Sequence, residues 1–136
     1  MNYWLMKSEP SSYSWDQLVK DKKTSWNGVR NFQASNNLKA MKIGDRVFFY
    51  HSNEGLAVVG IAEVGKTYYP DPTDKTERFG MVDVKPVAPF KTPVTMADIK
   101  KEPKLKDMAL LRQSRLSVGP VTADEWKLIC KMGGMK

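Results

Sequence analysis

The segment WNGVRNFQASNNL, residues 26–38, sets a tryptophan beside amide and guanidinium side chains before any helix is established. Arg30, Asn31 and Gln33 follow Trp26 closely. An exposed ring of this kind can stack on a planar heterocycle while amide side chains bond to the edge of that heterocycle. The other interpretation is a loop tryptophan folded back on the core, and the pattern alone favours neither.

A second polar group closes the first apolar run of the sequence, NYWLMKS. Lys7, Ser8 and Glu9 stand together at this point, and Pro10 restricts the backbone of Glu9 to an extended form. Three polar side chains held at the end of a core strand face either solvent or a cavity. The cavity interpretation makes this cluster a candidate binding site.

Tyr50, His51 and Ser52 end another apolar run, RVFFYHS. Residues at strand ends and in the loops beyond them commonly contact ligands. A single histidine is nevertheless more often a satisfied hydrogen-bonding residue than a ligand or a general base. Cys130 could pair with His51 only formally, because it falls on the apolar stripe of a predicted helix, where a buried thiol is inert.

The segment LLRQSRLSVGP, residues 110–120, gathers two arginines among small polar side chains. A strand period of two sets Arg115 and Ser117 on one face and Ser114 on the other. Arginine can hold a phosphate with two hydrogen bonds. Arg112 and Arg115, with the two serine hydroxyls, are therefore candidates for contact with a phosphate backbone.

The composition limits the classes of protein to which the chain can belong. With 136 residues, 41% of them hydrophobic and 27% charged, the chain suits one globular domain over residues 1–136. Its net charge of +7 and pI near 9.5 favour anionic partners, of which nucleic acid is the commonest. One cysteine and one histidine exclude an internal disulfide and the usual zinc clusters and favour a reducing, intracellular compartment.

Several functional classes have no signal in the sequence. No apolar run approaches the roughly 20 residues of a membrane span. The first residues lack the features of a secretory signal, so we expect the mature protein to begin at Met1. Phosphate-loop, nucleophile-elbow and zinc-protease motifs are absent. We therefore expect a monomer that uses no metal, no cofactor and no membrane.

The first half of the chain predicts one strand and two helices. A capping box formed by Ser14 and Gln17 begins a short helix, in which Leu18 and Val19 are expected to face inward. Apolar residues at helical spacing follow Phe32. The predicted elements are a strand over residues 2–8, a helix from Ser14 to about Lys22 and a helix from Phe32 that Gly44 ends.

The second half adds strands separated by short helices. Gly60 indicates a bulge or a close approach of the backbone, and Pro86 and Pro89 indicate a strand near a sheet edge. The predicted strands cover 46–52, 56–65, 80–90 and 115–121. Within residues 93–103 we predict a short helix that Thr95 caps and that ends before Pro103. A second helix begins at a capping box of Thr122 and Glu125, ends at Gly133 and buries Trp126, Ile129 and Cys130. The class is α+β, with five or six strands in a small mixed barrel.

These segments together resemble the EVE domain family over nearly the whole chain. The resemblance is carried by YWLMKSEP, by WNGVRNFQASNNLKAMKIGDRVFFYHSN, by GIAEV with YPDPT, by PVTMADIK and by DMALLRQSRLSVGPVTADEW. It implies a PUA-like fold, a small and strongly bent mixed β-barrel surrounded by short helices. It also implies a pocket related to that of YTH domains, which take a flipped modified base.

The resemblance assigns roles to positions of this chain. Trp26 would form a stacking wall, Asn31 with residues 7–9 would supply polar contacts, and residues 50–52 would form another wall. Arg30, Arg112 and Arg115 would lie nearer the phosphates. The implied site is Lys7, Ser8, Glu9, Trp26, Gly28, Val29, Arg30, Asn31, Tyr50, His51, Ser52, Arg112, Ser114, Arg115 and Ser117.

The chain departs from the family pattern at two positions. Phe32 and Ser35 stand where the family is associated with tyrosine and arginine. Phe32 should still pack but lacks a hydroxyl, and Ser35 lacks a charge for phosphate contact. The chain has no long basic N-terminal tail, so it resembles the bacterial, cytoplasmic members rather than the nuclear ones.

Three functions fit the sequence. The first is a non-catalytic reader of a modified base in DNA or RNA. The alternative is a small hydrolase of modified nucleosides, similar to the ASCH type, in which Lys7 and Glu9 would act if burial tuned their pKa values. The third is a protein-binding adaptor that docks through the helix with Leu18 and Val19 or through the basic run near Lys100.

Overall fold

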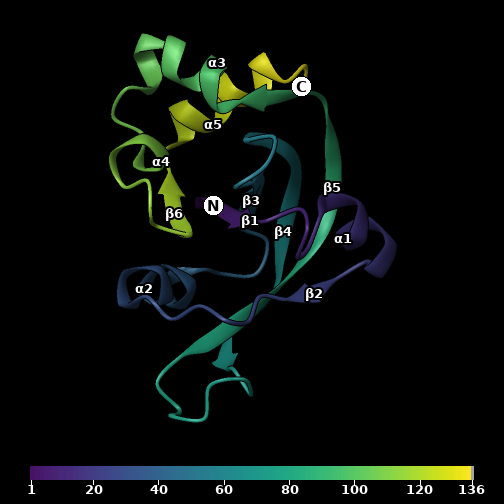
Figure 1. The fold of residues 1–136 in the computed structure, drawn as a ribbon, viewed down its shortest axis with the longest axis vertical. Helices are drawn as coiled ribbons and strands as arrows, with labels where there is room; N and C mark the ends of the chain where they lie inside the picture. The colour runs from purple at the N-terminus through teal and green to yellow at the C-terminus, as the bar shows by residue number, and fades with distance from the viewer. Residues whose placement is uncertain (136) are drawn as a thin grey trace.

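The computed structural model describes residues 1–135 and arranges them around one mixed six-stranded sheet (Figure 1). The strand order is β2-β5-β4-β3-β1-β6, in which β1 and β3 are parallel and the other neighbouring pairs are antiparallel. β2 and β6 form the two edges, so the sheet bends without closing completely. The strands are β1 (Tyr3–Ser8), β2 (Thr24–Ser25), β3 (Arg46–His51), β4 (Ala57–Pro70), β5 (Gly80–Thr95) and β6 (Val118–Val121).

Short helices surround this sheet and confirm the predicted α+β class. α3 and α5 lie together at the top of Figure 1, whereas α1 at the right and α2 at the lower left pack against the same hydrophobic core. No helix within residues 1–135 is long and apolar enough to cross a lipid bilayer. The helices are α1 (Trp15–Asp21), α2 (Phe32–Ala40), α3 (Met96–Lys101), the 3-10 helix η1 (Pro103–Leu105), α4 (Ala109–Arg112) and α5 (Ala123–Met132).

The central strands bury both of their faces. Successive side chains of a strand point to opposite sides of the sheet. In β3, Val47 and Phe49 therefore enter one hydrophobic core, while Phe48 and Tyr50 enter a second. The first core also holds side chains of α1 and α2, and the second holds side chains of α3, α4 and α5. This arrangement explains why β3 is an uninterrupted apolar run rather than an alternating one.

The capped helices begin where the sequence predicts, although one cap is incomplete. A reciprocal capping box is present at Thr122, and Thr95 also caps its helix. At α1, the Ser14 hydroxyl accepts from the Gln17 amide as predicted. The Gln17 side chain, however, donates to the Asp21 carboxylate at 2.8 Å instead of returning to the cap. The predicted box is therefore only half formed, because a partner one turn ahead competes for this side chain.

Two expectations about helix packing are corrected. Val19 is 48% exposed rather than inward, because the adjacent Leu18 and Trp15 occupy the buried face of α1. The helix α2 ends at Ala40, before Gly44. Gly44 instead adopts a positive φ of 91° in the turn that leads into β3.

The last strand is shorter than predicted. β6 begins only at Val118, because residues 113–117 form a turn in which the Leu116 amide donates to the Gln113 carbonyl at 3.0 Å. The two-faced strand expected for this segment is therefore wrong. A turn directs the polar side chains of residues 112–115 outward, where they are exposed.

Gly60 confirms the predicted close approach of the backbone. The register of β4 shifts between Val58 and Gly60, and a Cβ atom on Gly60 would lie 2.6 Å from the Trp15 ring. Pro86 and Pro89 lie in the part of β5 beyond Val84, the last residue that pairs with β2. They therefore face an open edge, as the sequence predicts.

His51 fixes the start of α1 on the end of β3. The Trp15 amide donates to Nε2 of His51 at 3.1 Å, so that nitrogen must be unprotonated. Burial lowers the pKa of His51 below its ordinary 6.5, and the nearby Asp16 opposes this shift. His51 is therefore a satisfied structural residue that joins a helix to the sheet.

The lowered pKa of His51 predicts a pH-dependent stability. Neutral His51 stabilises the fold above its unfolded pKa, and this contribution is lost as the pH falls through the lower, folded value. We expect the free energy of unfolding in urea to decrease between about pH 7.5 and 5.5. His51→Gln keeps an acceptor that does not titrate, so its stability should depend less on pH. An equal decrease in the variant would contradict this assignment.

Candidate functional site

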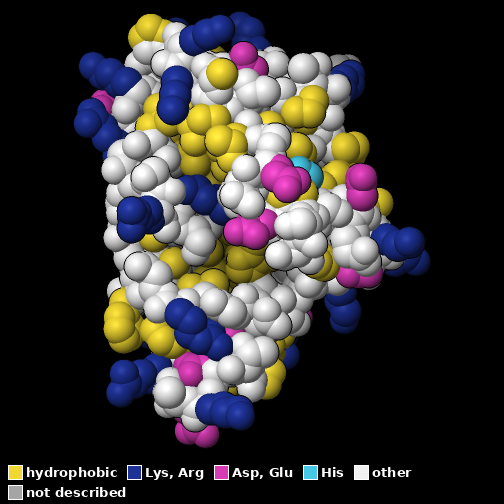
Figure 2. All heavy atoms as spheres, in the orientation of Figure 1, with side chains coloured by type: hydrophobic (Ala, Val, Ile, Leu, Met, Phe, Trp, Pro, Cys, Tyr) yellow, Lys and Arg dark blue, Asp and Glu magenta, His cyan; other side chains and the backbone are white. Residues whose placement is uncertain are grey.

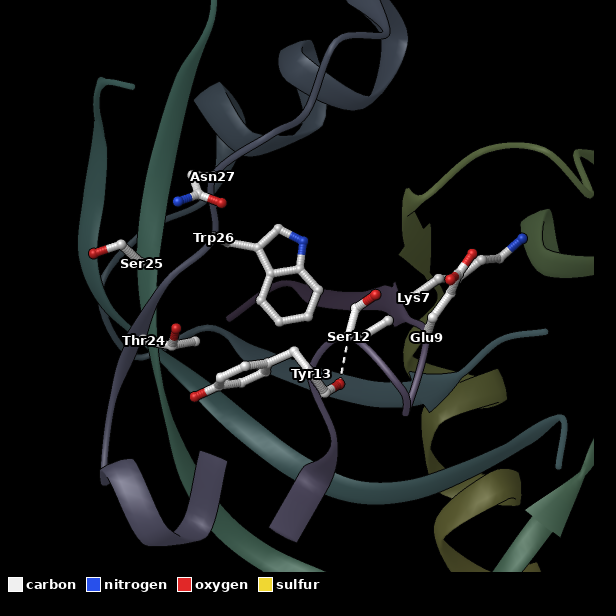
Figure 3. Close-up of a pocket in the computed structure, with 9 residues that line it drawn as sticks. Lys7, Glu9, Ser12, Tyr13, Thr24, Ser25, Trp26 and Asn27 are labelled. Carbon is white, nitrogen blue, oxygen red and sulfur yellow. Dashed lines mark hydrogen bonds between the residues drawn. The ribbon is translucent and has the colours of Figure 1, made fainter. Parts of the chain in front are cut away.

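A cavity of about 470 Å³ opens where the end of β1, the turn after it and the short strand β2 meet. Figure 2 shows this face hollowed near its middle, with hydrophobic side chains on the floor and charged side chains of both signs at the rim. The volume suits a small planar ligand. The lining residues, most of which Figure 3 labels, are Lys7, Ser8, Glu9, Ser12, Tyr13, Thr24, Ser25, Trp26 and Asn27.

Trp26 both packs against the core and lines the cavity, so each of the two interpretations of the sequence describes part of its position. Its ring packs edge to face on Phe49, with centroids 5.6 Å apart and planes at 87°, so one edge rests on the first core. The indole also lines the cavity (Figure 3). Trp4, Trp15 and Trp126 are only 6%, 6% and 8% exposed, whereas Trp26 is half-buried. The supported ring is thus held in place with a surface free for stacking.

The cavity brings the end of β1 together with Trp26, which follows β2. The residues that β1 and the turn after it contribute are Lys7, Ser8 and Glu9. The Lys7 ammonium donates to the carbonyl of Ser114 at 2.7 Å, and burial lowers the pKa of Lys7. Ser8 donates through its hydroxyl to the Tyr13 carbonyl at 2.6 Å, the bond that Figure 3 marks. The cluster therefore presents the remaining N–H donors of Lys7, the Ser8 oxygen as an acceptor and the Glu9 carboxylate to whatever enters.

Sequence reasoning missed the remaining walls of the cavity. Tyr13 supplies a second aromatic ring, and its hydroxyl donates to the Asp21 carboxylate at 2.9 Å. Thr24 and Ser25 reach the cavity because β2 pairs with Val84 and Asp83 of β5. A two-residue strand has no periodicity to detect. The only available signal was the run of hydroxyl residues that leads into Trp26.

A second hollow, of about 320 Å³, lies between the start of α2 and the turn after α4. Asn31 belongs to this hollow rather than to the cavity, because its side chain caps α2 by accepting from the Ala34 amide at 2.9 Å. Ser117 contributes its carbonyl to the Lys7 amide rather than a free hydroxyl to this hollow. The lining residues are Asn31, Gln33, Arg112, Gln113, Ser114, Arg115 and Leu116.

The two predicted phosphate-contacting arginines of the second hollow differ in their surroundings. Arg112 donates to the Asp107 carboxylate at 2.6 Å, and both side chains are well exposed. Arg115 is exposed and forms no ion pair within residues 1–135. Arg115 therefore offers an uncompensated charge to an anion. The bond from Lys7 to the Ser114 carbonyl joins the wall of this second hollow to the cavity.

Arg30 has a structural partner that the sequence did not reveal. Its guanidinium donates to Asp71 at 3.1 Å and to the Thr73 hydroxyl at 2.9 Å. The Gly28 amide, at a φ of 82°, donates to the same carboxylate at 2.8 Å. Burial acts to raise the pKa of Asp71, but hydrogen bonds from Thr73 and Gly28 and the Arg30 guanidinium outweigh it and lower the pKa to about 2. Val29, between these two, is buried in the first core.

The structure does not place residues 50–52 at the cavity, which corrects the expected second wall. Tyr50 points into the second core, on the opposite side of β3 from Phe49, and its side chain is 1% exposed. His51 is occupied by the Trp15 amide, and the Ser52 amide donates to the Ser8 carbonyl at 2.9 Å. The strict alternation of β3 explains the error, since neighbouring residues cannot share one face.

The two departures from the family pattern have different outcomes. Ser35 is 2% exposed, with its hydroxyl 3.4 Å from that of Tyr68, so it lies inside the protein. Phe32 packs against the Phe79 ring, with centroids 5.0 Å apart, but 64% of it stays exposed. No cluster of three or more metal-ligating side chains lies within residues 1–135. The cavity and the second hollow together provide an aromatic ring, hydrogen-bonding groups and the positive charge of Arg115.

Comparison with known proteins relates the chain to a family and to solved structures. The sequence profile of the EVE domain matches residues 2–132. Thymocyte nuclear protein 1 of Rattus norvegicus is 36% identical over 165 residues, which cover 96% of this chain and 73% of that protein. Rpa0253 from Rhodopseudomonas palustris is 58% identical, with a TM-score of 0.94 over 98% of this chain and 94% of that one.

Two further structures contain nucleic acid. The human THYN1 protein in complex with 5-methylcytosine containing DNA is 32% identical, with a TM-score of 0.91 over 100% of this chain and 99% of that one. The YTH domain of Zygosaccharomyces rouxii MRB1, in complex with N6-methyladenosine RNA, has a TM-score of 0.62 over 97% and 86% of the two chains. At 16% identity it supports the expected PUA-like fold alone. With the profile match and these relatives together, the chain belongs to the EVE domain family.

Proposed function

We propose that this protein is a non-catalytic reader that binds nucleic acid and takes one modified base, flipped out of its strand, into the cavity. One observation carries the proposal. Trp26 is the half-buried tryptophan, held by Phe49 from behind, and it lines a cavity with polar groups on the opposite wall. A base entering this space would stack on the indole and meet Lys7, Ser8 and Glu9 with its edge.

The free energies involved make the other contacts decisive. Flipping a base out of its stack costs a few kcal/mol, and stacking on an aromatic side chain returns about 1–3 kcal/mol. Stacking therefore roughly offsets the cost of flipping and leaves little for affinity. Hydrogen bonds inside the cavity supply selectivity for the base, and contacts to phosphates outside it supply the remaining binding free energy.

A relative suggests which base to test first. The human THYN1 protein has been crystallised in complex with 5-methylcytosine containing DNA, and this chain is 32% identical to it. A 5-methyl group adds apolar surface to a pyrimidine without adding charge. Contact with the rings of Trp26 and Tyr13 would remove this methyl group from water, which favours binding. We therefore propose 5-methylcytosine as the first candidate base.

The second hollow supports a phosphate contact beside the cavity. Arg115 has no carboxylate partner within residues 1–135, and the Ser114 carbonyl in the same turn is tied to Lys7. A strand whose base occupies the cavity would pass this turn with its backbone. The net charge of +7 favours the same kind of partner.

A hydrolase of modified nucleosides is the second candidate. The lowered pKa of Lys7 favours it, because a lysine with reduced proton affinity can act as a base. Two observations weigh against it. Lys7 is already bonded to the Ser114 carbonyl, and Glu9 is exposed at the rim rather than held against a partner. The reader function fits these contacts better.

Replacement of Trp26 by alanine should remove recognition of the modified base. We expect affinity for a 5-methylcytosine oligonucleotide to fall by about 5- to 150-fold, since alanine removes the stacking surface. Affinity for the unmodified oligonucleotide should hardly change. Fluorescence anisotropy measures both constants, and Trp26→Phe, which retains an aromatic ring, should keep part of the discrimination. Unchanged discrimination in the alanine variant would disprove the stacking role.

Replacement of Arg115 by alanine should weaken binding to all sequences alike. The slope of log affinity against log salt concentration should become shallower by about 1, as one phosphate contact is lost. Arg112→Ala is the matched control, because Asp107 already compensates that charge. Titrations at several salt concentrations measure the slopes. A selective loss for the modified oligonucleotide would instead place Arg115 at the base.

The reader function also predicts that nucleosides survive contact with the protein. A panel of acylated and alkylated nucleosides, 5-methylcytidine among them, is incubated with excess protein and analysed by liquid chromatography. We expect every nucleoside to be recovered intact, since Lys7 is held by a carbonyl rather than aligned with a second catalytic group. Turnover that Lys7→Ala abolishes would establish the hydrolase instead.

A further inference from the structure

Phe32 is an exposed aromatic ring outside the cavity that the function proposed above does not use. It begins α2, and 64% of it is accessible to solvent. Burial of a phenylalanine side chain normally stabilises a fold, and most of that contribution is absent at this exposed position. The position therefore needs an explanation other than stability.

The ring is supported from behind rather than free to move. Phe79, from the loop between β4 and β5, packs against Phe32 with centroids 5.0 Å apart and planes tilted by 37°. The Arg30 guanidinium lies 5.8 Å from the centre of the Phe79 ring. Asp71, whose side chain is fully buried, holds Arg30 in turn. This chain of contacts fixes one face of Phe32 and leaves the other open.

The surroundings of Phe32 favour a nucleic acid over an apolar partner. Asn31 and Gln33, its neighbours in sequence, line the second hollow together with Arg115. Hydrophobic side chains reach the surface beside α2 in Figure 2, and basic side chains lie close to them. A ring next to amide and guanidinium groups offers stacking and phosphate contact at one place.

Phe32 also lies within reach of a strand whose base fills the cavity. Phe32 and Trp26 belong to one continuous segment, and six residues of extended chain span at most about 20 Å. A stacked strand advances about 3.4 Å per nucleotide, so the two rings lie within about six nucleotides of each other. One strand can therefore contact both.

We propose that Phe32 is a second stacking surface, which takes an unpaired base flanking the nucleotide in the cavity. The inference rests on the proposed function in one respect: the strand that stacks on Phe32 is the strand whose base occupies the cavity. The two rings have different tasks: Trp26 acts on the modified base, and Phe32 stacks on any base, because every base has a π face. Phe32 therefore adds affinity without adding discrimination.

The test compares two single-stranded oligonucleotides of 13 nucleotides, one plain and one with a central 5-methylcytosine. Phe32→Ala should weaken binding of both by the same factor, about 5- to 150-fold in anisotropy titrations. Phe32→Tyr should bind like the original protein. Ile43→Ala is the matched control, because Ile43 is 70% exposed beyond the other end of α2. Unfolding temperatures check that both alanine variants remain folded, since Phe32→Ala also removes the contact with Phe79.

The possible outcomes separate this inference from the reader function. Equal affinities for Phe32→Ala and Ile43→Ala would overturn it, and so would a loss confined to the methylated strand. Concentration-dependent dimers in sedimentation that Phe32→Ala abolishes would also overturn it, by assigning the ring to a second copy of the chain. If Trp26→Ala leaves discrimination intact while Phe32→Ala weakens both strands, the stacking surface stands and the reader function falls.

Discussion

The carboxylate of Asp71 joins two segments of the chain that lie 43 residues apart. It accepts hydrogen bonds from the Gly28 amide, from Arg30 and from Thr73, and its side chain is fully buried. Leaving a buried charge without its partner typically costs about 3–5 kcal/mol, so this arrangement is strongly favoured once formed. The segment it holds carries Trp26 at one end and Phe32 at the other. The geometry of the cavity, the second hollow and the exposed ring thus depends on one acidic side chain that contacts no ligand.

The predictable part of the fold came from local patterns. Thr122 begins a helix because a capping box is a short-range pattern that needs no tertiary partner, and the apolar run of β3 marks a strand buried on both faces. The same reasoning failed for Gln17, because its side chain donates to the Asp21 carboxylate instead of bonding back to the N-cap residue Ser14. It also failed for residues 113–117, where a turn replaced the alternating pattern of a strand.

The candidate site was predictable only where a residue's role follows from its own position. Lys7 and Glu9 end a core strand, and Trp26 stands in a loop, so the sequence brought them forward as candidates. Tyr13, Thr24 and Ser25 reach the cavity through pairing with distant segments, which one sequence does not reveal. Tyr50, His51 and Ser52 are consecutive in the sequence, but a strand directs consecutive side chains to opposite faces, so adjacency alone does not predict a shared wall.

The position of β1 in the sheet bears on how the protein is made. β1 lies between β3 and β6, so one of its two neighbours, Val118–Val121, comes far later in the chain. Contacts between such distant residues slow folding, because a long loop must close before they form. On the ribosome, residues near the start must wait for Val118–Val121 to emerge before the sheet is complete. The strand that ends at the cavity therefore completes its pairing only after β6 has been synthesised.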